Sequence, residues 1–158
     1  DLENYLDVWI IQIALAESVA ARLRKHGFKC KTVEITVRDN GLYSFSRQIH
    51  LRQPTNITNE IVTAAFQLFK DNYKWEYPIR SLGIRAADLV LDDIPVQLDL
   101  FGNQEKKEKL EKLDRTVDEI RRRFGYFSIQ RAAMYQDKVL SHLDAGTHTI
   151  HPHSYFHG

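Results

Sequence analysis

The sequence lacks the cysteine pairs that would form disulfides and the long apolar runs that would anchor a protein in a membrane. Cysteine occurs once, at Cys30, so no disulfide can form within the chain, and this favours a reducing compartment. No apolar run approaches the ~18–20 residues of a membrane-spanning helix, and no secretory signal is recognisable. We therefore expect a cytoplasmic protein with no membrane partner. The only methionine is Met134 and the sequence opens at Asp1, so we interpret it as part of a longer chain.

Catalytic patterns are also missing. There is no glycine-rich phosphate loop, no Ser–His–Asp or Cys–His arrangement, and no group of converging carboxylates that could hold Mg²⁺ for phosphoryl transfer. Histidines gather near the end of the sequence, but they have no cysteine partners, and we expect no metal site there. We therefore predict a non-catalytic unit without a metal or cofactor of its own.

What the sequence does have is a core. Hydrophobic residues make up 43% of the 158 residues, and the formal net charge is only +1, so any nucleic acid would have to be met by a local patch. Periodicity predicts helices over residues 8–26, 58–73 and 104–124, a short helix over 128–143, and strands over 29–38, 43–52 and 79–86. Gly27 is expected to end the first helix, and Thr58 to cap the second.

This order predicts an α+β fold in which two helices cover one face of an antiparallel sheet. The other face is polar and interleaves hydroxyl and amide groups with cations, which suits phosphate oxygens. Its candidate residues are Thr36, Arg38, Ser44, Ser46, Gln48, His50 and Arg52, with Lys31, Arg47, Arg80 and Arg85 from edges and loops. The alternative is an ordinary solvated face. Strict alternation places Arg47 beside Ile49, on the helix side, unless a bulge lies nearby.

A short apolar peptide follows a chain-breaking proline. Its residues are Gln97, Leu98, Asp99, Leu100 and Phe101, preceded by Pro95. Leu100 and Phe101 could anchor the peptide in a pocket of another protein, with Asp99 facing solvent. The alternative is a last strand that packs on its own sheet.

The helix after this peptide has an apolar repeat. Leu110, Leu113, Val117, Ile120 and Phe124 follow 3-4-3-4 spacing, so we expect an apolar neighbour for this face. Three arginines, 121–123, end the helix, where they complement its dipole or could contact DNA.

Several of these segments resemble the C-terminal "little finger" domain of bacterial Y-family (translesion) DNA polymerases. The first helix, 15–27, the strand 47–55 and the strand 78–84 resemble family segments in the family's order. Residues 97–101 match the QLxLF peptide by which bacterial polymerases bind the sliding clamp. Residues 102–125 resemble the C-terminal extension of Gram-positive members.

The resemblance implies the fold and the function. It implies a little finger domain over 1–96, a clamp-binding peptide over 97–101, a helical extension over 102–144 and an irregular tail over 145–158. The family fold begins with a strand that we expect upstream of Asp1. The implied partners are template–primer DNA and the sliding clamp, and Arg47 is implied as a DNA contact. Mg²⁺ is expected only in the catalytic domain of the parent polymerase, which this sequence does not include.

Two other functions fit the residues. A stand-alone adaptor could bind RNA through the sheet, although such sheets usually display aromatic residues for stacking. An interaction module could instead dimerise through the apolar repeat of the 104–124 helix.

Overall fold

The computed structural model describes residues 1–93, 104–132 and 134. Its first element is helix α1 (Tyr5–His26), which begins where the side chain of Asn4 accepts a hydrogen bond from the Asp7 amide at 2.9 Å. The helix ends at Gly27, whose φ of 74° lies in the left-handed region that glycine adopts without steric cost. The predicted C-cap is therefore confirmed.

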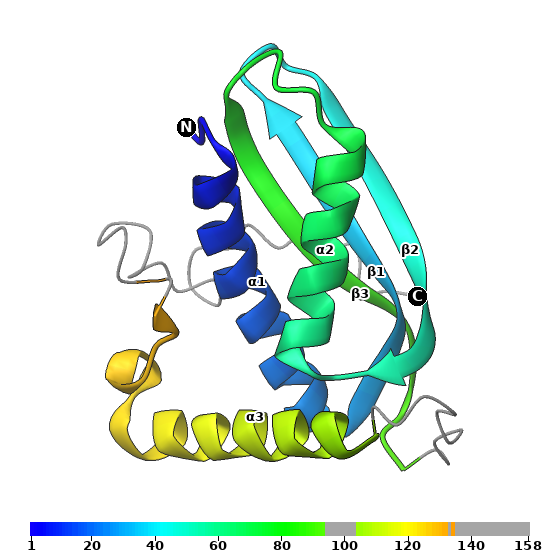
Figure 1. Cartoon of the computed structure of the whole chain (residues 1–158), viewed down its shortest axis with the longest axis vertical. Helices are drawn as coiled ribbons and strands as arrows, with labels where there is room; N and C mark the ends of the chain where they lie inside the picture. Colours follow the sequence, from blue (N-terminus) through cyan, green and yellow to red (C-terminus); the bar gives the residue numbers. More distant parts are fainter. Residues whose placement is uncertain (94–103, 133, 135–158) are drawn as a thin grey trace.

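A three-stranded antiparallel sheet forms the centre of the molecule. Its strands are β1 (Phe28–Asp39), β2 (Ser44–Thr55) and β3 (Ile79–Leu91), in the order β2-β1-β3 (Figure 1). Strand β3 runs five residues beyond its predicted end at Ala86. Near the start of β3, Leu2 and Ile79 exchange two backbone hydrogen bonds of 2.9 Å.

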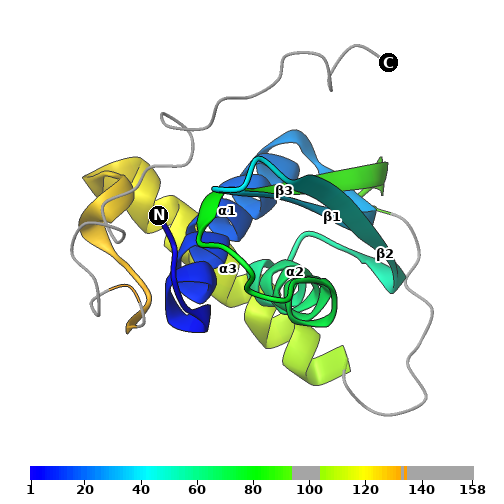
Figure 2. The same ribbon diagram turned by 90° about the horizontal axis from the view of Figure 1, so that it is seen from above.

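Helix α1 and helix α2 (Thr58–Asn72) cover the same face of this sheet, as Figure 2 shows. The apolar side chains of β1 and the inner face of α2 meet in the core. Among the residues there, Val33, Ile35, Ile61 and Phe69 are fully buried. Burial of such side chains stabilises a fold by roughly 1.5–3 kcal/mol each. The predicted α+β fold with two helices on one face is confirmed.

Helix α3 (Gln104–Phe124) runs across the ends of α1 and α2 (Figure 1). It is fixed there mainly by charge. Arg24 of α1 has a side chain only 6% exposed; it binds Asp118 at 2.7 Å and Asp114 at 3.2 Å. A second pair joins Glu17 to Arg121 at 2.9 Å.

Asp114 of α3 also caps the N-terminus of α2. The expected cap, Thr58, is the first helical residue, and the N-cap position is Ile57, which has no capping side chain. The prediction that Thr58 caps this helix is therefore wrong. The backbone N–H of Thr58 instead donates to the carboxylate of Asp114 at 2.9 Å, although the two residues are 56 positions apart. A carboxylate at this end also complements the helix dipole.

Within the described residues the apolar repeat of α3 is only partly covered, with Leu110, Val117 and Ile120 partly buried. Leu113 is 52% exposed and Phe124 is 74% exposed. The helix turns residues 107, 111, 114, 118 and 121 toward the domain, about a quarter turn from the apolar repeat. The arginines at its end form ion pairs within the domain, Arg121 with Glu17, and Arg122 and Arg123 with Glu119.

After α3 the chain folds back on the domain. Residues Tyr126–Ser128 form a 3₁₀ turn and Ile129 is extended, so an α-helix does not begin at Ser128 as predicted. Arg131 then binds Glu17 at 3.0 Å and Asn59 at 2.7 Å. The remainder of the predicted helix, 135–143, and the tail from 145 onward lie outside the described residues. None of the helices described has the length and apolar character that crossing a membrane requires.

The buried ion pairs make a prediction about stability. Replacing Arg24 with Ala leaves Asp114 buried without its main cationic partner, which costs about 3 kcal/mol or more when one side of a buried pair is removed. Urea denaturation followed by circular dichroism should show this as a lower unfolding midpoint. The control is Lys109→Ala, which removes an exposed cation from the same helix and should leave the midpoint unchanged. Equal midpoints for Arg24→Ala and the wild type would show that α3 is not held by this network.

Candidate nucleic-acid interface

The face of the sheet opposite to α1 and α2, which we call the open face, is organised in four rows across the three strands. The register between β1 and both neighbours is continuous from Thr32 to Arg38, so side chains that are paired across strands point to the same side. The rows are Ser44–Arg38–Ser81, Ser46–Thr36–Gly83, Gln48–Glu34–Arg85 and His50–Thr32–Ala87. Predicted site residues from all three strands, including Arg85 of β3, are thus brought together with Ser81, Gly83 and Ala87, which sequence reasoning did not select.

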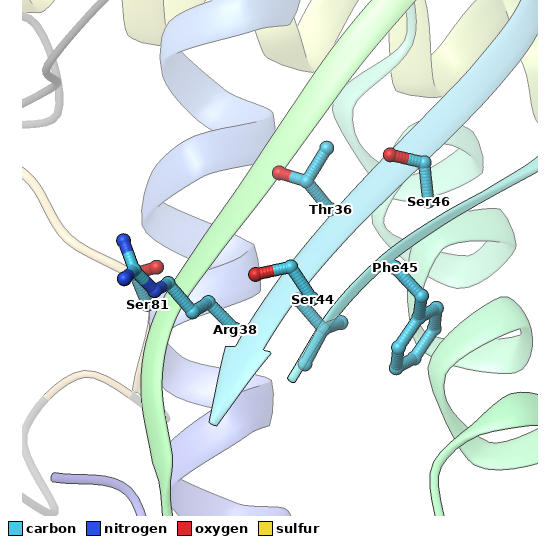
Figure 3. Close-up of a pocket in the computed structure, with 7 residues that line it drawn as sticks. Thr36, Arg38, Ser44, Phe45, Ser46 and Ser81 are labelled. Carbon is cyan, nitrogen blue, oxygen red and sulfur yellow. The ribbon is translucent and has the colours of Figure 1, made fainter. Parts of the chain in front are cut away.

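The first two rows form a hollow rich in hydroxyl groups. Figure 3 shows the hydroxyl groups of Ser44 and Ser46 on one side of β2 and the ring of Phe45 on the other side. Thr36, Ser81 and the exposed guanidinium of Arg38 complete the polar lining. Four hydroxyl groups that can donate, beside one cation, are well suited to the oxygen atoms of a phosphate group.

Gly83 gives this hollow its shape. A methyl group at position 83 would overlap the hydroxyl group of Thr36 on the adjacent strand. The missing side chain therefore leaves room for Thr36 to turn its hydroxyl group over β3. Gly83 needs no unusual backbone angle here, so its role is to allow this close approach.

The third row carries opposite charges. Arg85 Nη1 lies 3.9 Å from Glu34 Oε1, and the Glu34 side chain is 18% exposed. This carboxylate partly offsets the cation in the middle of the face. The face is therefore not uniformly basic.

The fourth row is a chain of hydrogen bonds across all three strands. The Thr32 hydroxyl oxygen lies 2.8 Å from Nδ1 of His50 and 2.6 Å from Oδ2 of Asp88. Asp88 has a φ of 53°, which is uncommon for a residue other than glycine. Sequence reasoning selected His50 but missed Asp88, because alternation alone assigns residue 88 to the helix side.

Arg47 lies outside these rows. Its partner in the register is Ile35, whose side chain is on the helix side, and there is no register shift near it. The bulge that would bring Arg47 to the open face is therefore absent. Its guanidinium lies 5.3 Å from the centre of the Phe45 ring, and Nη1 donates to the Ser46 carbonyl at 2.8 Å. The contact of Arg47 with DNA stays a prediction. Such a contact would have to be made at the edge of the sheet, where β2 is the outer strand.

The other predicted cations lie at the two ends of the sheet. Lys31 and Arg52 are exposed beside the register shift between Cys30 and Thr32, and Arg80 is exposed beside the shift between Arg38 and Asp39. Alternation does not assign residues at such irregularities to one face. The predicted clamp peptide, 97–101, lies outside the described residues.

The described residues hold no cluster of three or more metal-ligating side chains. Cys30 is buried at the core side of β1, and burial raises the pKa of its thiol to about 11. A thiol in this state is a poor nucleophile and a poor metal ligand. The groups that the open face offers to a ligand are hydroxyl groups, amides and cations, which bind anions without chemical change.

Known proteins identify the class of domain to which this arrangement belongs. Residues 1–100 match the impB/mucB/samB family C-terminal domain. A DNA polymerase IV from Acetivibrio thermocellus is 42% identical over 143 residues, which cover 90% of this chain and 36% of that protein. A DNA polymerase IV 2 from Bacillus subtilis is 34% identical over 137 residues, covering 84% of this chain and 32% of that protein. The chain thus spans about a third of the length of these relatives.

The fold is an α+β domain in which two helices cover one face of the sheet and polar side chains line the other. The chain belongs to the impB/mucB/samB family C-terminal domain, the C-terminal domain of Y-family DNA polymerases. The resemblance noted in the sequence is therefore confirmed.

Proposed function

We propose that the open sheet face holds template–primer DNA by its phosphate backbone. The observation that carries this proposal is the hollow lined by Thr36, Arg38, Ser44, Ser46 and Ser81, which lies on the face opposite to α1 and α2. Hydroxyl groups and a guanidinium are the groups that contact phosphate in protein–DNA complexes. The DNA polymerase names of the relatives support DNA as the ligand.

This mode of binding is independent of sequence and of modest strength. Contacts to phosphate carry no base readout, as a polymerase moving along any template requires. Glu34 and Asp88 on the same face reduce its positive potential, so the domain grips DNA by a few local contacts. Such a grip assists a polymerase without preventing it from advancing.

We further propose that residues 97–101 tether the parent protein to the sliding clamp. Support comes from the sequence, where Leu100 and Phe101 are the last two residues of a peptide of the QLxLF type. The parent protein is then a translesion DNA polymerase that extends primers opposite damaged bases. Its Mg²⁺ and its catalytic carboxylates belong to a separate domain, and this chain is a non-catalytic part of it.

The grip on DNA predicts a strong dependence on salt. Affinity for primer–template DNA, measured by fluorescence anisotropy, should fall steeply between about 50 and 200 mM salt and should not vary with sequence. Arg38→Ala should reduce the slope of log affinity against log salt by about 1, because one phosphate contact is lost. The control Arg122→Ala makes the same charge change on α3 and should keep the slope. A flat salt curve for the wild type would exclude phosphate contacts.

The tether predicts loss of clamp binding when its anchors are removed. The double substitution Leu100→Ala and Phe101→Ala should abolish binding to a bacterial sliding clamp in fluorescence polarisation, because each buried anchor contributes roughly 2 kcal/mol or more. Asp99→Ala, at the position expected to face solvent, should bind within about twofold of the wild type. Undiminished binding by the double variant would contradict the tether.

One observation favours a second function, the dimerising module. The apolar side chains of Leu113 and Phe124 are exposed on α3. Sedimentation equilibrium decides this alternative: a dimer that Leu113→Glu converts to a monomer would support it. A wild-type chain that stays monomeric at ~100 μM would exclude it and leave the DNA proposal in place.

A further inference from the structure

The hydrogen-bonded row at the far end of the open face contains a histidine whose two ring nitrogens have different surroundings. Nδ1 of His50 faces the Thr32 hydroxyl oxygen at 2.8 Å, and the same oxygen lies 2.6 Å from the Asp88 carboxylate. Thr32 is 1% exposed, whereas His50 on β2 is exposed. One edge of the ring is therefore fixed within the sheet while the rest is accessible.

The backbone of Asp88 is shaped to make this contact. Ala87 is paired with Thr32 and points to the open face, so regular alternation would turn residue 88 to the helix side. The φ of 53° at Asp88 departs from the strand geometry, and its carboxylate reaches the open-face hydroxyl instead. A residue other than glycine held in this region costs of order 1–3 kcal/mol, and such outliers point to a function.

The protons in this row can be counted. A carboxylate only accepts hydrogen bonds, so the single proton of the Thr32 hydroxyl group is donated to Asp88. The hydroxyl oxygen then has only lone pairs to offer His50, and Nδ1 must carry the proton of that contact. In the neutral ring Nε2 is consequently a bare acceptor, which cannot donate to phosphate. In the protonated ring Nε2 gains an N–H that can.

We propose that Thr32 and Asp88 are positioning residues that make His50 a proton-dependent phosphate contact. They fix the neutral ring in the form that cannot donate to DNA, so this row binds a phosphate group only when His50 is protonated. Histidine changes charge between about pH 5 and 8. The proposal rests on the proposed function, because it assumes that DNA lies on this face.

The surrounding charges define what the proton changes. The other charged residues of these strands that lie nearest to His50 in the register are Lys31 and Glu34 of β1, Arg52 of β2, and Arg85 of β3. Glu34 is engaged with Arg85, and Asp88 is the carboxylate linked to His50 through Thr32. Protonation of His50 gives its Nε2 an N–H to donate, and it adds a second anion contact to the one at Arg38.

The first experiment measures primer–template affinity by anisotropy at pH 8.0 and pH 5.5. For the wild type we expect affinity to rise roughly three- to tenfold at the lower pH, and the salt slope to steepen by about 1 because one more phosphate is contacted. His50→Asn is the matched control, because its amide can still donate to Thr32 but has no second nitrogen and no titration. The His50→Asn variant also measures the part of the pH response that comes from the other histidines. An equal pH response in both proteins would overturn the proposal.

A second variant tests the proton count. In Asp88→Asn the amide can donate to the Thr32 hydroxyl oxygen, which frees the hydroxyl proton for Nδ1 and moves the ring proton to Nε2. Affinity at pH 8.0 should then rise toward the wild-type value at pH 5.5, and the pH response should shrink. The same substitution made in the His50→Asn background measures the effect of removing the Asp88 charge alone. An equal gain in both backgrounds would mean that charge alone acts, and the positioning role would be wrong.

Nuclear magnetic resonance of the ring nitrogens gives a readout without DNA. Long-range ¹⁵N–¹H spectra at pH 8.0 should show the wild-type proton of His50 on Nδ1, and in Asp88→Asn on Nε2. A proton on Nε2 in the wild type would overturn the proposal whatever the DNA results. If the wild type binds no DNA at any pH but the Nδ1 proton is found, the proposed function fails and the arrangement of the row stands without its ligand.

Discussion

The strict alternation of β1 is the constraint on which the rest of the structure depends. Between Thr32 and Arg38 the central strand keeps one register with both neighbours, so Val33, Ile35 and Val37 all point to the helices. A shift of one residue would exchange the two faces completely. Burial of these side chains under α1 and α2 therefore fixes, at the same time, which polar side chains face outward. The polar rows of the open face are a direct consequence of the packing of the core.

The second constraint is the attachment of α3. The residues that match the family domain end at 100, yet α3 supplies Asp114 to cap α2 and to bind Arg24. Because Arg24 is almost fully buried, its charge needs these carboxylates, and α3 behaves as part of the folded domain. The boundary that the sequence resemblance places between the domain and the helical extension thus separates residues that form buried ion pairs and hydrogen bonds with each other. The ion pairs lie away from the open face, so they stabilise the domain without altering the surface proposed for DNA.

Most of the fold could be predicted from short-range signals. Gly27 ends α1 and the turn after Asp39 joins β1 to β2 because both depend on local backbone preferences. The docking of α3 could not be predicted, since the contact between Arg24 and Asp114 joins residues 90 positions apart and leaves no periodic signal. The apolar repeat of α3 was conspicuous, but the described contacts of α3 with α1 and α2 are made by charged residues on another face of the helix. For the candidate site, alternation correctly predicted that Ser44, Ser46 and His50 lie on the open face. It also correctly predicted that Arg47 does not.

The residues that sequence reasoning missed were those whose role depends on a neighbour. Gly83 contributes only the space that Thr36 occupies. Asp88 reaches the open face through a backbone angle that no residue pattern indicates. Both act in rows that span three strands, so they become visible only when the register is known. The DNA grip proposed here is accordingly a property of the assembled sheet and not of any one strand.

The central claim is that DNA lies on the face of the sheet opposite to α1 and α2. Site-specific photo-crosslinking tests it most directly, with a benzophenone attached to a cysteine at Ser46→Cys on the open face or at Gln67→Cys on the exposed side of α2. Cys30 is fully buried and should not be labelled. The account predicts that primer–template DNA crosslinks to the label at position 46 and not to the label at position 67. Crosslinking from position 67 with none from position 46 would contradict it.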